Sequence, residues 1–169
     1  IYVSKVESPA DAIHFNRLIL EDDPNDAEAL GALDGLFQQT EDDAALVDVL
    51  ARRIDLSDDV PHRIALSFRL GALFEQQPET MARAIDVYAR VRSDIDPTDL
   101  RAHAALERLY GQLNDHAPLV EVLLDHAEQV EAPDTQIELL LRAARHQEVG
   151  LEQASQAVET YRQILEIDA

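Results

Sequence analysis

The segment DPNDAEALGALDGLFQQTEDDAALVDVL, residues 23–50, recurs later in the chain as DPTDLRAHAALERLYGQLNDHAPLVEVL, residues 96–123. The two segments align without a gap at an offset of 73 residues, and both begin with Asp-Pro and end with Leu-Val, an acidic residue and Val-Leu. The match continues at the same offset beyond both segments, where Arg69 aligns with Arg142 and Tyr88 with Tyr161. Similarity at one fixed offset is the signature of a repeat protein.

The 73-residue unit contains a shorter repeat. The pair Leu36-Phe37 returns as Leu73-Phe74 after 37 residues, and as Leu109-Tyr110 after another 36. An elementary unit of about 36 residues accommodates two helices and two short turns. Within each unit the apolar residues recur at spacings of three and four, which is the helical pattern.

Proline, glycine and aspartate interrupt this pattern and mark the turns. The sequence therefore predicts nine helices, at residues 10–22, 26–38, 42–56, 61–76, 79–95, 99–112, 115–130, 134–148 and 152–167. Acidic residues near the helix starts are expected to act as N-caps, since they favour the positive helix end; they are Asp26, Asp42, Asp99, Asp115 and Asp134. Residues 1–9 show no helical pattern and are predicted to form an extended leader.

The elementary unit resembles the tetratricopeptide repeat (TPR), a helix pair of about 34 residues with conserved small and aromatic positions. The first-helix motif appears as Leu70-Gly71-x-x-Phe74, and the second-helix motif as Ala84-x3-Tyr88-x2-Val91 and Ala157-x3-Tyr161-x2-Ile164. The chain departs from the family pattern at the tryptophan, which is absent, and at the glycine, which is replaced by Asp34 and Glu107 in two units.

The resemblance implies an all-α fold, a right-handed superhelical solenoid of antiparallel helix pairs. It would cover residues 10–169, as a lone second helix at 10–22 followed by the pairs 26–56, 61–95, 99–130 and 134–167. Such repeats stack because one helix pair cannot bury both of its faces. The last predicted helix is apolar on more than one side, so we expect the chain to be a fragment of a longer repeat protein.

The charge of the chain limits its partners. It carries 34 acidic and 14 basic residues, for a net charge of −20. Such a field repels phosphate backbones and anionic membrane surfaces, so nucleic acid and membranes are not expected partners. Cationic peptides and positive protein surfaces fit better, although solubility alone would also explain the charge. The sequence does not determine the cellular compartment. The cytoplasm is favoured, but a targeting signal could lie outside the fragment.

No catalytic constellation is present in the sequence. The chain has no cysteine, no G-x-S-x-G, no glycine-rich phosphate loop and no H-E-x-x-H, so we expect no enzyme activity, no catalytic residue and no cofactor. No two of the six histidines are four residues apart on one helix, and the acidic stretch from Asp22 to Asp26 lacks the glycine and closing glutamate of a calcium loop. No metal site is therefore predicted.

The resemblance places the candidate binding surface on the concave groove, which the first helix of each pair lines in the family. The groove residues implied by the alignment are Gln38, Gln39, Phe68, Arg101, Arg108, Gln112, Leu141 and Arg145. Three of them are arginines, whose forked guanidinium groups suit carboxylates. The alternative is that these arginines only offset the surrounding acidic residues. The lysine and asparagine pattern with which some family members clamp an acidic C-terminus is absent.

The sequence thus favours a protein-interaction scaffold. The chain would bind a protein or peptide segment in the concave groove, or associate with copies of itself through its exposed terminal helices. A regulatory or substrate-recruiting region of a larger enzyme is the alternative. A third hypothesis is that the chain binds RNA, as some repeats of helix pairs do by recognising one base per repeat, but the net charge disfavours it.

Overall fold

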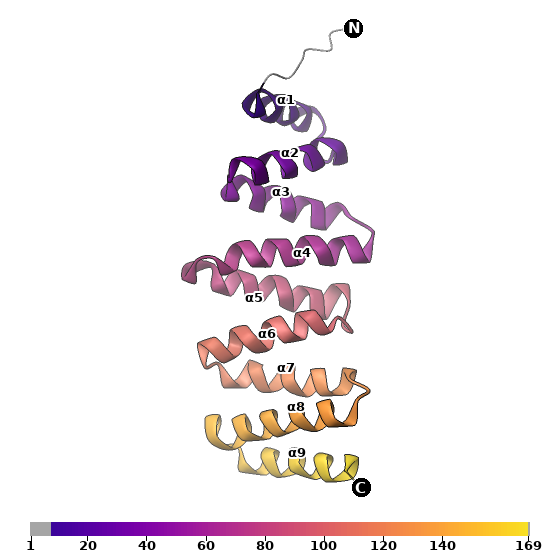
Figure 1. The fold of residues 1–169 in the computed structure, drawn as a ribbon, viewed down its shortest axis with the longest axis vertical. Helices are drawn as coiled ribbons and strands as arrows, with labels where there is room; N and C mark the ends of the chain where they lie inside the picture. Colours follow the sequence, from indigo (N-terminus) through magenta and orange to yellow (C-terminus); the bar gives the residue numbers. More distant parts are fainter. Residues whose placement is uncertain (1–7, 169) are drawn as a thin grey trace. The chain divides into compact units, whose positions relative to one another are not determined.

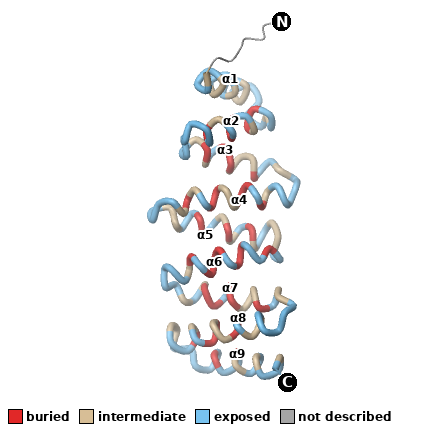
Figure 2. Tube along the Cα trace, in the orientation of Figure 1, coloured by how far each residue is buried: buried red, intermediate tan, exposed pale blue. Residues whose placement is uncertain are grey.

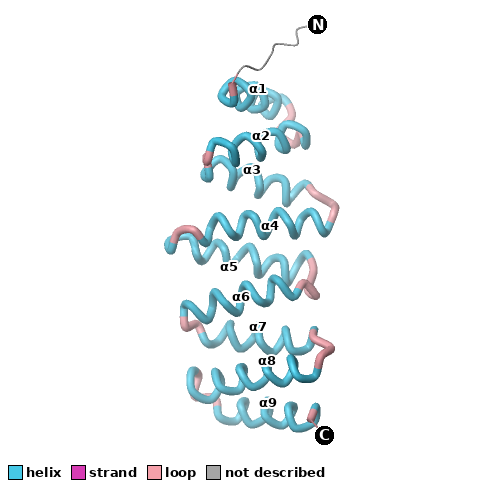
Figure 3. Tube along the Cα trace, in the orientation of Figure 1, coloured by secondary structure: helices cyan, strands magenta, loops and turns pink. Residues whose placement is uncertain are grey.

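The computed structural model describes residues 8–168, which form helices joined by short turns, with no strand among them (Figures 1 and 3). Nine α-helices in this described range confirm the all-α prediction. The chain divides into two units, residues 1–87 and residues 88–169. The predicted leader falls mostly outside the described residues; of its members, Ser8 caps the first helix and Pro9 begins it.

The first unit holds α1 (Pro9–Asp22), α2 (Ala27–Thr40), α3 (Asp43–Leu56) and α4 (Val60–Glu75), followed by a 3₁₀ turn, η1 (Pro78–Thr80), and most of α5 (Met81–Arg90). The second unit holds a π-helical turn, η2 (Val91–Ile95), then α6 (Leu100–Leu113), α7 (His116–Gln129), α8 (Pro133–Arg145), a second π-helical turn, η3 (His146–Gly150), and α9 (Ala154–Ile167). Within each unit successive helices pack against each other: α1 to α4 in the first and α6 to α9 in the second.

Buried residues recur along the helices of both units (Figure 2), and leucine is the commonest of the buried apolar residues. Leu33 and Leu50 are buried in the first unit, and their partners at the 73-residue offset, Leu106 and Leu123, are buried in the second. Burying one such side chain stabilises a fold by roughly 1.5–3 kcal/mol. The duplicated sequence therefore places equivalent leucines in equivalent cores.

The aspartate caps are present where the helix starts match the prediction. Asp26 accepts a hydrogen bond from the Ala29 amide at 2.7 Å, and Asp42 accepts one from the Ala45 amide at 3.1 Å. Asp99 accepts from the Arg101 amide at 2.9 Å. Asp115 occupies the N-cap of α7 without such a bond, and Asp134 lies inside α8, whose N-cap is Ala132, so the capping role predicted for it is wrong.

The helix ends also follow the duplication. Glu41 ends α2 with φ of 56°, and Asn114, at the same offset, ends α6 with φ of 52°. Two helices end differently from the prediction, because their last turns are π-helical. The Asp96 amide donates to the Val91 carbonyl at 2.8 Å, and the Leu151 amide donates to the His146 carbonyl at 3.1 Å. Apolar spacing cannot distinguish a single turn of this kind from an α-helical turn.

Candidate functional site

A buried carboxylate joins three successive helices of the first unit. Asp34, on α2, is only 4% exposed. Its carboxylate accepts hydrogen bonds from Arg69 of α4, at 2.8 Å from Nη1 and 2.5 Å from Nη2, and it also pairs with Arg53 of α3. Charged hydrogen bonds satisfy both oxygens, which a buried carboxylate requires.

The second unit repeats this arrangement at the same spacing. Glu107, on α6 and 8% exposed, accepts from Arg142 Nη1 of α8 at 2.8 Å and pairs with Nδ1 of His126 on α7. In both units the partners lie 19 and 35 residues after the carboxylate. We call each set, Asp34–Arg53–Arg69 and Glu107–His126–Arg142, a carboxylate bracket. In each bracket the carboxylate occupies the position of the glycine in the resembled repeat. Its contacts join three helices, so the role of the bracket is structural.

The predicted groove residues of the first unit lie at the surface or near it. Gln38 and Gln39 are exposed at the end of α2, and Phe68 is half-buried on α4, where it has a further interaction partner. None of these three lines the pocket beside Phe74 or the pocket beside Leu56, both in the first unit.

The predicted groove residues of the second unit lie on α6 and α8. Arg101, Arg108 and Gln112 are exposed on α6, Leu141 is half-buried and Arg145 exposed on α8. Arg101 and Arg108, seven residues apart on α6, are both exposed, and the groove-facing position of this face stays a prediction.

Intramolecular contacts already occupy two of these arginines. Arg101 Nη2 donates to Asp99 Oδ2 at 2.5 Å, and Arg108 also has an interaction partner. Hydrogen bonds from Arg101 lower the pKa of Asp99, because they stabilise its charged form. The alternative reading, that arginines offset local acid, thus has a geometric basis at Arg101.

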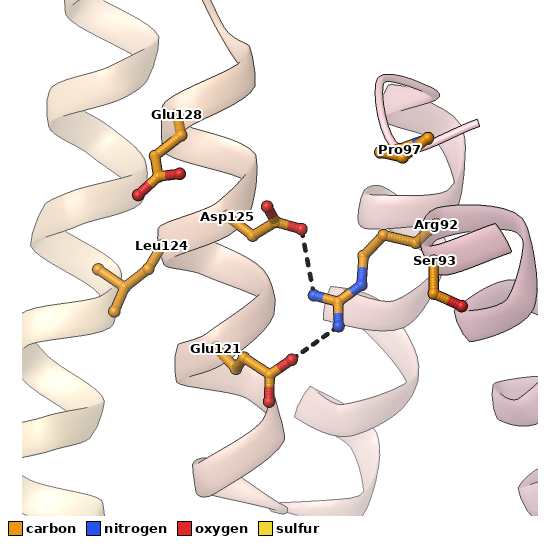
Figure 4. Close-up of a pocket in the computed structure, with 7 residues that line it drawn as sticks. All are labelled: Arg92, Ser93, Pro97, Glu121, Leu124, Asp125 and Glu128. Atoms are coloured by element: carbon orange, nitrogen blue, oxygen red, sulfur yellow. Dashed lines mark hydrogen bonds and ion pairs between the residues drawn. The ribbon is translucent and has the colours of Figure 1, made fainter.

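An open pocket of about 550 Å³ lies in the second unit beside α7. Figure 4 shows Arg92 pointing between two carboxylates, with Nη2 at 2.7 Å from Glu121 and Nη1 at 3.3 Å from Asp125. Leu124 and Glu128 project from α7 on the side away from Arg92. The pocket therefore combines an acidic rim with an apolar side chain.

A second opening, of about 340 Å³, adjoins the first and shares Leu124 and Glu128 with it. Leu140 and Ile167 belong to its apolar lining, and Glu166 adds another acidic group. Leu124 and Ile167 pack against the buried core of the second unit, which holds this lining in place. We call the two openings together the α7 groove. Its lining carries four carboxylates against one guanidinium, those of Glu121, Asp125, Glu128, Glu166 and Arg92.

A fully buried histidine supports the rim of this groove. His103 of α6 contacts Asp125 Oδ2 through Nε2 at 3.0 Å and the carbonyl oxygen of Asp99 through Nδ1 at 3.1 Å. Both ring nitrogens therefore lie within hydrogen-bond distance of an oxygen atom. Sequence reasoning missed the α7 groove because the resemblance directs attention to first helices, whereas the pairing predicted from the sequence makes α7 and α9 second helices.

Two other histidines of the second unit are 30 residues apart in the sequence and lie side by side in the structure. His116 Nδ1 and His146 Nδ1 lie 3.1 Å apart. The pKa of His146 is lowered, first by partial burial and then by the neighbouring His116 and Arg142. No group of three or more His, Cys, Asp or Glu residues suited to a metal occurs in residues 8–168.

No protein-family model matches the sequence, and no curated protein sequence matches it either. The fold is similar to the crystal structure of MamA, with a TM-score of 0.50 and 18% identity over 99% of this chain and 96% of that one. It is equally similar to YrrB, a TPR protein with an unusual peptide-binding site, with a TM-score of 0.50 and 16% identity over 98% of this chain and 80% of that one. These likenesses establish the fold, and they confirm a TPR-like helical repeat. Within its described part, the chain has no helix with the length and hydrophobicity to cross a membrane.

Proposed function

We propose that this chain is a protein-interaction scaffold without enzyme activity of its own, which binds a segment of a partner protein. The α7 groove carries the proposal, because it is an open, partly apolar surface whose leucine, isoleucine and alanine residues belong to the buried core of the second unit or pack against it. YrrB offers a precedent for peptide binding on this fold. The alternative, a regulatory region of a larger enzyme, has no feature of the described residues in its favour.

The composition of the α7 groove selects the chemistry of the partner segment. The lining carries four carboxylates and one arginine, and that arginine already engages two of the carboxylates. A segment with two or more lysines or arginines would be attracted, and an apolar residue between them would cover Leu124. An acidic segment or a phosphate backbone would be repelled, which also supports the absence of nucleic acid among the partners.

The magnitudes indicate a weak interaction. Two exposed ion pairs contribute about 0.2–1 kcal/mol each, and burying one or two leucine-sized side chains contributes roughly 1.5–3 kcal/mol each. The favourable total, roughly 2–8 kcal/mol, is reduced by the cost of association. We therefore expect dissociation constants no tighter than micromolar from this groove alone.

Two other surfaces from the sequence analysis remain proposals. The exposed arginine face of α6 and α8, with Arg101, Arg108 and Arg145, would suit an acidic segment. Self-association is supported by large apolar side chains exposed on the terminal helices: Phe15 and Leu18 on α1, and Val158 and Leu165 on α9.

A displayed library of random 12-residue peptides tests these surfaces. Selection on wild type should enrich sequences with basic residues flanking an apolar one. Binding of the enriched peptides, measured by fluorescence anisotropy, should weaken at least fivefold with Glu128→Lys and with Leu124→Ala. Glu28→Lys, the same charge change on the exposed surface of α2, serves as the matched control and should leave binding unchanged.

The other outcomes discriminate among the surfaces. Enrichment of acidic peptides that Arg101→Glu/Arg108→Glu no longer binds would move the site to the arginine face. A concentration-dependent mass in analytical ultracentrifugation that Leu165→Glu abolishes would assign self-association. A library that yields no enriched sequence, together with a monomeric chain, would refute the scaffold proposal.

A further inference from the structure

The histidine pair of the second unit has the geometry of a chelate. His116 is the first residue of α7 and His146 is the first residue of η3. Their Nδ1 atoms lie 3.1 Å apart, and the ring centroids are 5.1 Å apart with planes inclined by 31°. Both side chains are half-buried, so part of the pair stays accessible to solvent. Without a cation, one neutral ring can donate a hydrogen bond to the other.

The nitrogen separation matches two bonds to one cation. Bonds from zinc to histidine nitrogen measure about 2.0–2.1 Å. Two nitrogens 3.1 Å apart at that bond length define an angle of about 100° at the cation. This value lies between the angles of cis ligands in square-planar and tetrahedral coordination, both of which transition metals use. A cation bound in this way lies off the line that joins the two nitrogens, so each ring has to rotate until its Nδ1 lone pair points at the cation, and the ring that donates the hydrogen bond has to carry its proton on Nε2 instead.

The lack of a side chain at Gly150 leaves room for the His116 ring. A Cβ atom at Gly150 would lie 2.5 Å from His116 Cγ and 2.6 Å from Cδ2. The absence of a side chain therefore lets η3, which carries His146 at its start, approach the ring directly. η3 also packs against α7, α8 and α9, so packing between helices fixes the backbone at both His116 and His146. Pre-positioned ligands lose less conformational entropy when they bind.

The charge around the pair is partly compensated. Arg142 is near enough to act on His146, but its Nη1 is bound by the bracket carboxylate Glu107 at 2.8 Å. The cation is attracted by the net charge of −20 carried by the whole chain.

We propose that His116 and His146 together bind one divalent transition-metal cation of the zinc, nickel or copper class through their Nδ1 atoms. Neutral imidazole is a ligand of choice for these metals, whereas calcium and magnesium prefer oxygen. No third His, Cys, Asp or Glu completes the set among residues 8–168, so water or a donor from a partner protein fills the remaining positions. With two protein ligands instead of four, the site is expected to bind its cation more weakly than a closed structural zinc site.

Titration calorimetry with zinc chloride, on the full chain without a histidine tag, tests this proposal. We expect one saturable site per chain in wild type. His116→Asn and His146→Asn should each weaken it at least tenfold, while His14→Asn, an exposed histidine of α1, should leave it unchanged. Gly150→Ala should also weaken zinc binding, because the added methyl group displaces the His116 ring. Circular dichroism in EDTA establishes that each variant is folded before it is compared.

Copper provides a direct view of the ligands. With one equivalent of Cu²⁺, electron paramagnetic resonance should show coupling to two imidazole nitrogens in wild type, and to fewer in His146→Asn. Wild type without a zinc site, folded variants that bind zinc as tightly as wild type, or a copper spectrum unchanged by His146→Asn would each overturn the proposal. The readouts do not involve the α7 groove, so they are independent of peptide binding.

Discussion

Replacing Asp34 with asparagine should destabilise the first unit, because the variant keeps the shape of the side chain but removes the charge between two arginines. Asp34 is 6% exposed at its side chain, and Arg69 bonds to it at 2.8 and 2.5 Å. Removing one member of a buried ion pair costs about 3–5 kcal/mol. Arg53 and Arg69 keep 21% and 39% of their side chains exposed, so water can solvate part of the unpaired charge. We therefore expect a loss of about 2–3 kcal/mol in the free energy of unfolding.

Urea unfolding followed by far-ultraviolet circular dichroism measures this loss. With a slope of about 2 kcal/mol per molar urea, the midpoint for Asp34→Asn should fall by about 1–1.5 M. Asp48→Asn, an exposed aspartate on α3, is the matched control and should change the unfolding free energy by no more than about 0.5 kcal/mol. Because the chain comprises two units, the transition is fitted with and without an intermediate.

A triple variant separates the ion cluster from its packing. Replacing Asp34 with leucine, and Arg53 and Arg69 with methionine, removes every charge of the bracket and keeps most of its volume. Buried ion clusters can often be replaced by apolar residues without loss, so this variant should recover much of the stability that Asp34→Asn loses. The reasoning is refuted if Asp34→Asn is as stable as wild type or no less stable than Asp48→Asn.

Three further predictions concern the second unit and the glycines. Glu107→Gln should lower the unfolding free energy by about 2 kcal/mol in the same urea assay, since it removes the negative charge of the second carboxylate bracket. A midpoint equal to that of wild type would contradict the equivalence of the two brackets. The pKa of Asp99 is lowered in the folded chain, so its stabilising contribution is present above about pH 4 and disappears as the pH falls through the folded pKa; Asp99→Asn should flatten the dependence of stability on pH below about pH 4. Gly150→Ala should cost about 1–3 kcal/mol because its methyl group meets His116, whereas Gly31→Ala, with open space in helix α2, should gain about 0.5–1 kcal/mol; melting temperatures that move in the same direction for both would contradict the difference in packing.

The helices could be predicted from the sequence because local spacing and caps determine them. The predicted helix at 42–56 is observed as Asp43–Leu56, and that at 152–167 as Ala154–Ile167. The π-helical turns that follow α5 and α8 could not be predicted, since they change the hydrogen-bond register of one turn without changing the apolar pattern.

The sites depended on contacts between helices, which local spacing does not determine. The replacement of glycine by Asp34 and Glu107 was visible in the alignment, but their arginine partners lie on other helices. A search for histidines four residues apart could not find His116 and His146, which are 30 residues apart. The predicted groove residues stay a prediction, because none of them lines the four pockets beside Leu56, Phe74 and α7.

The spacing of the carboxylate brackets has a consequence for how such a chain can lengthen or shorten by recombination. Deleting residues 35–107 would bring His126 and Arg142 to 19 and 35 positions after Asp34, so the shortened chain would still contain one complete bracket. Deleting residues 35–70, a single helix-pair length, would place Ala89 and Ala105 at those positions, so neither position would carry a basic residue for Asp34. Recombination that preserves a complete bracket would therefore add or remove 73 residues, or two helix pairs, at a time. The unit that is duplicated in the gene would then be twice as long as the 36-residue structural repeat.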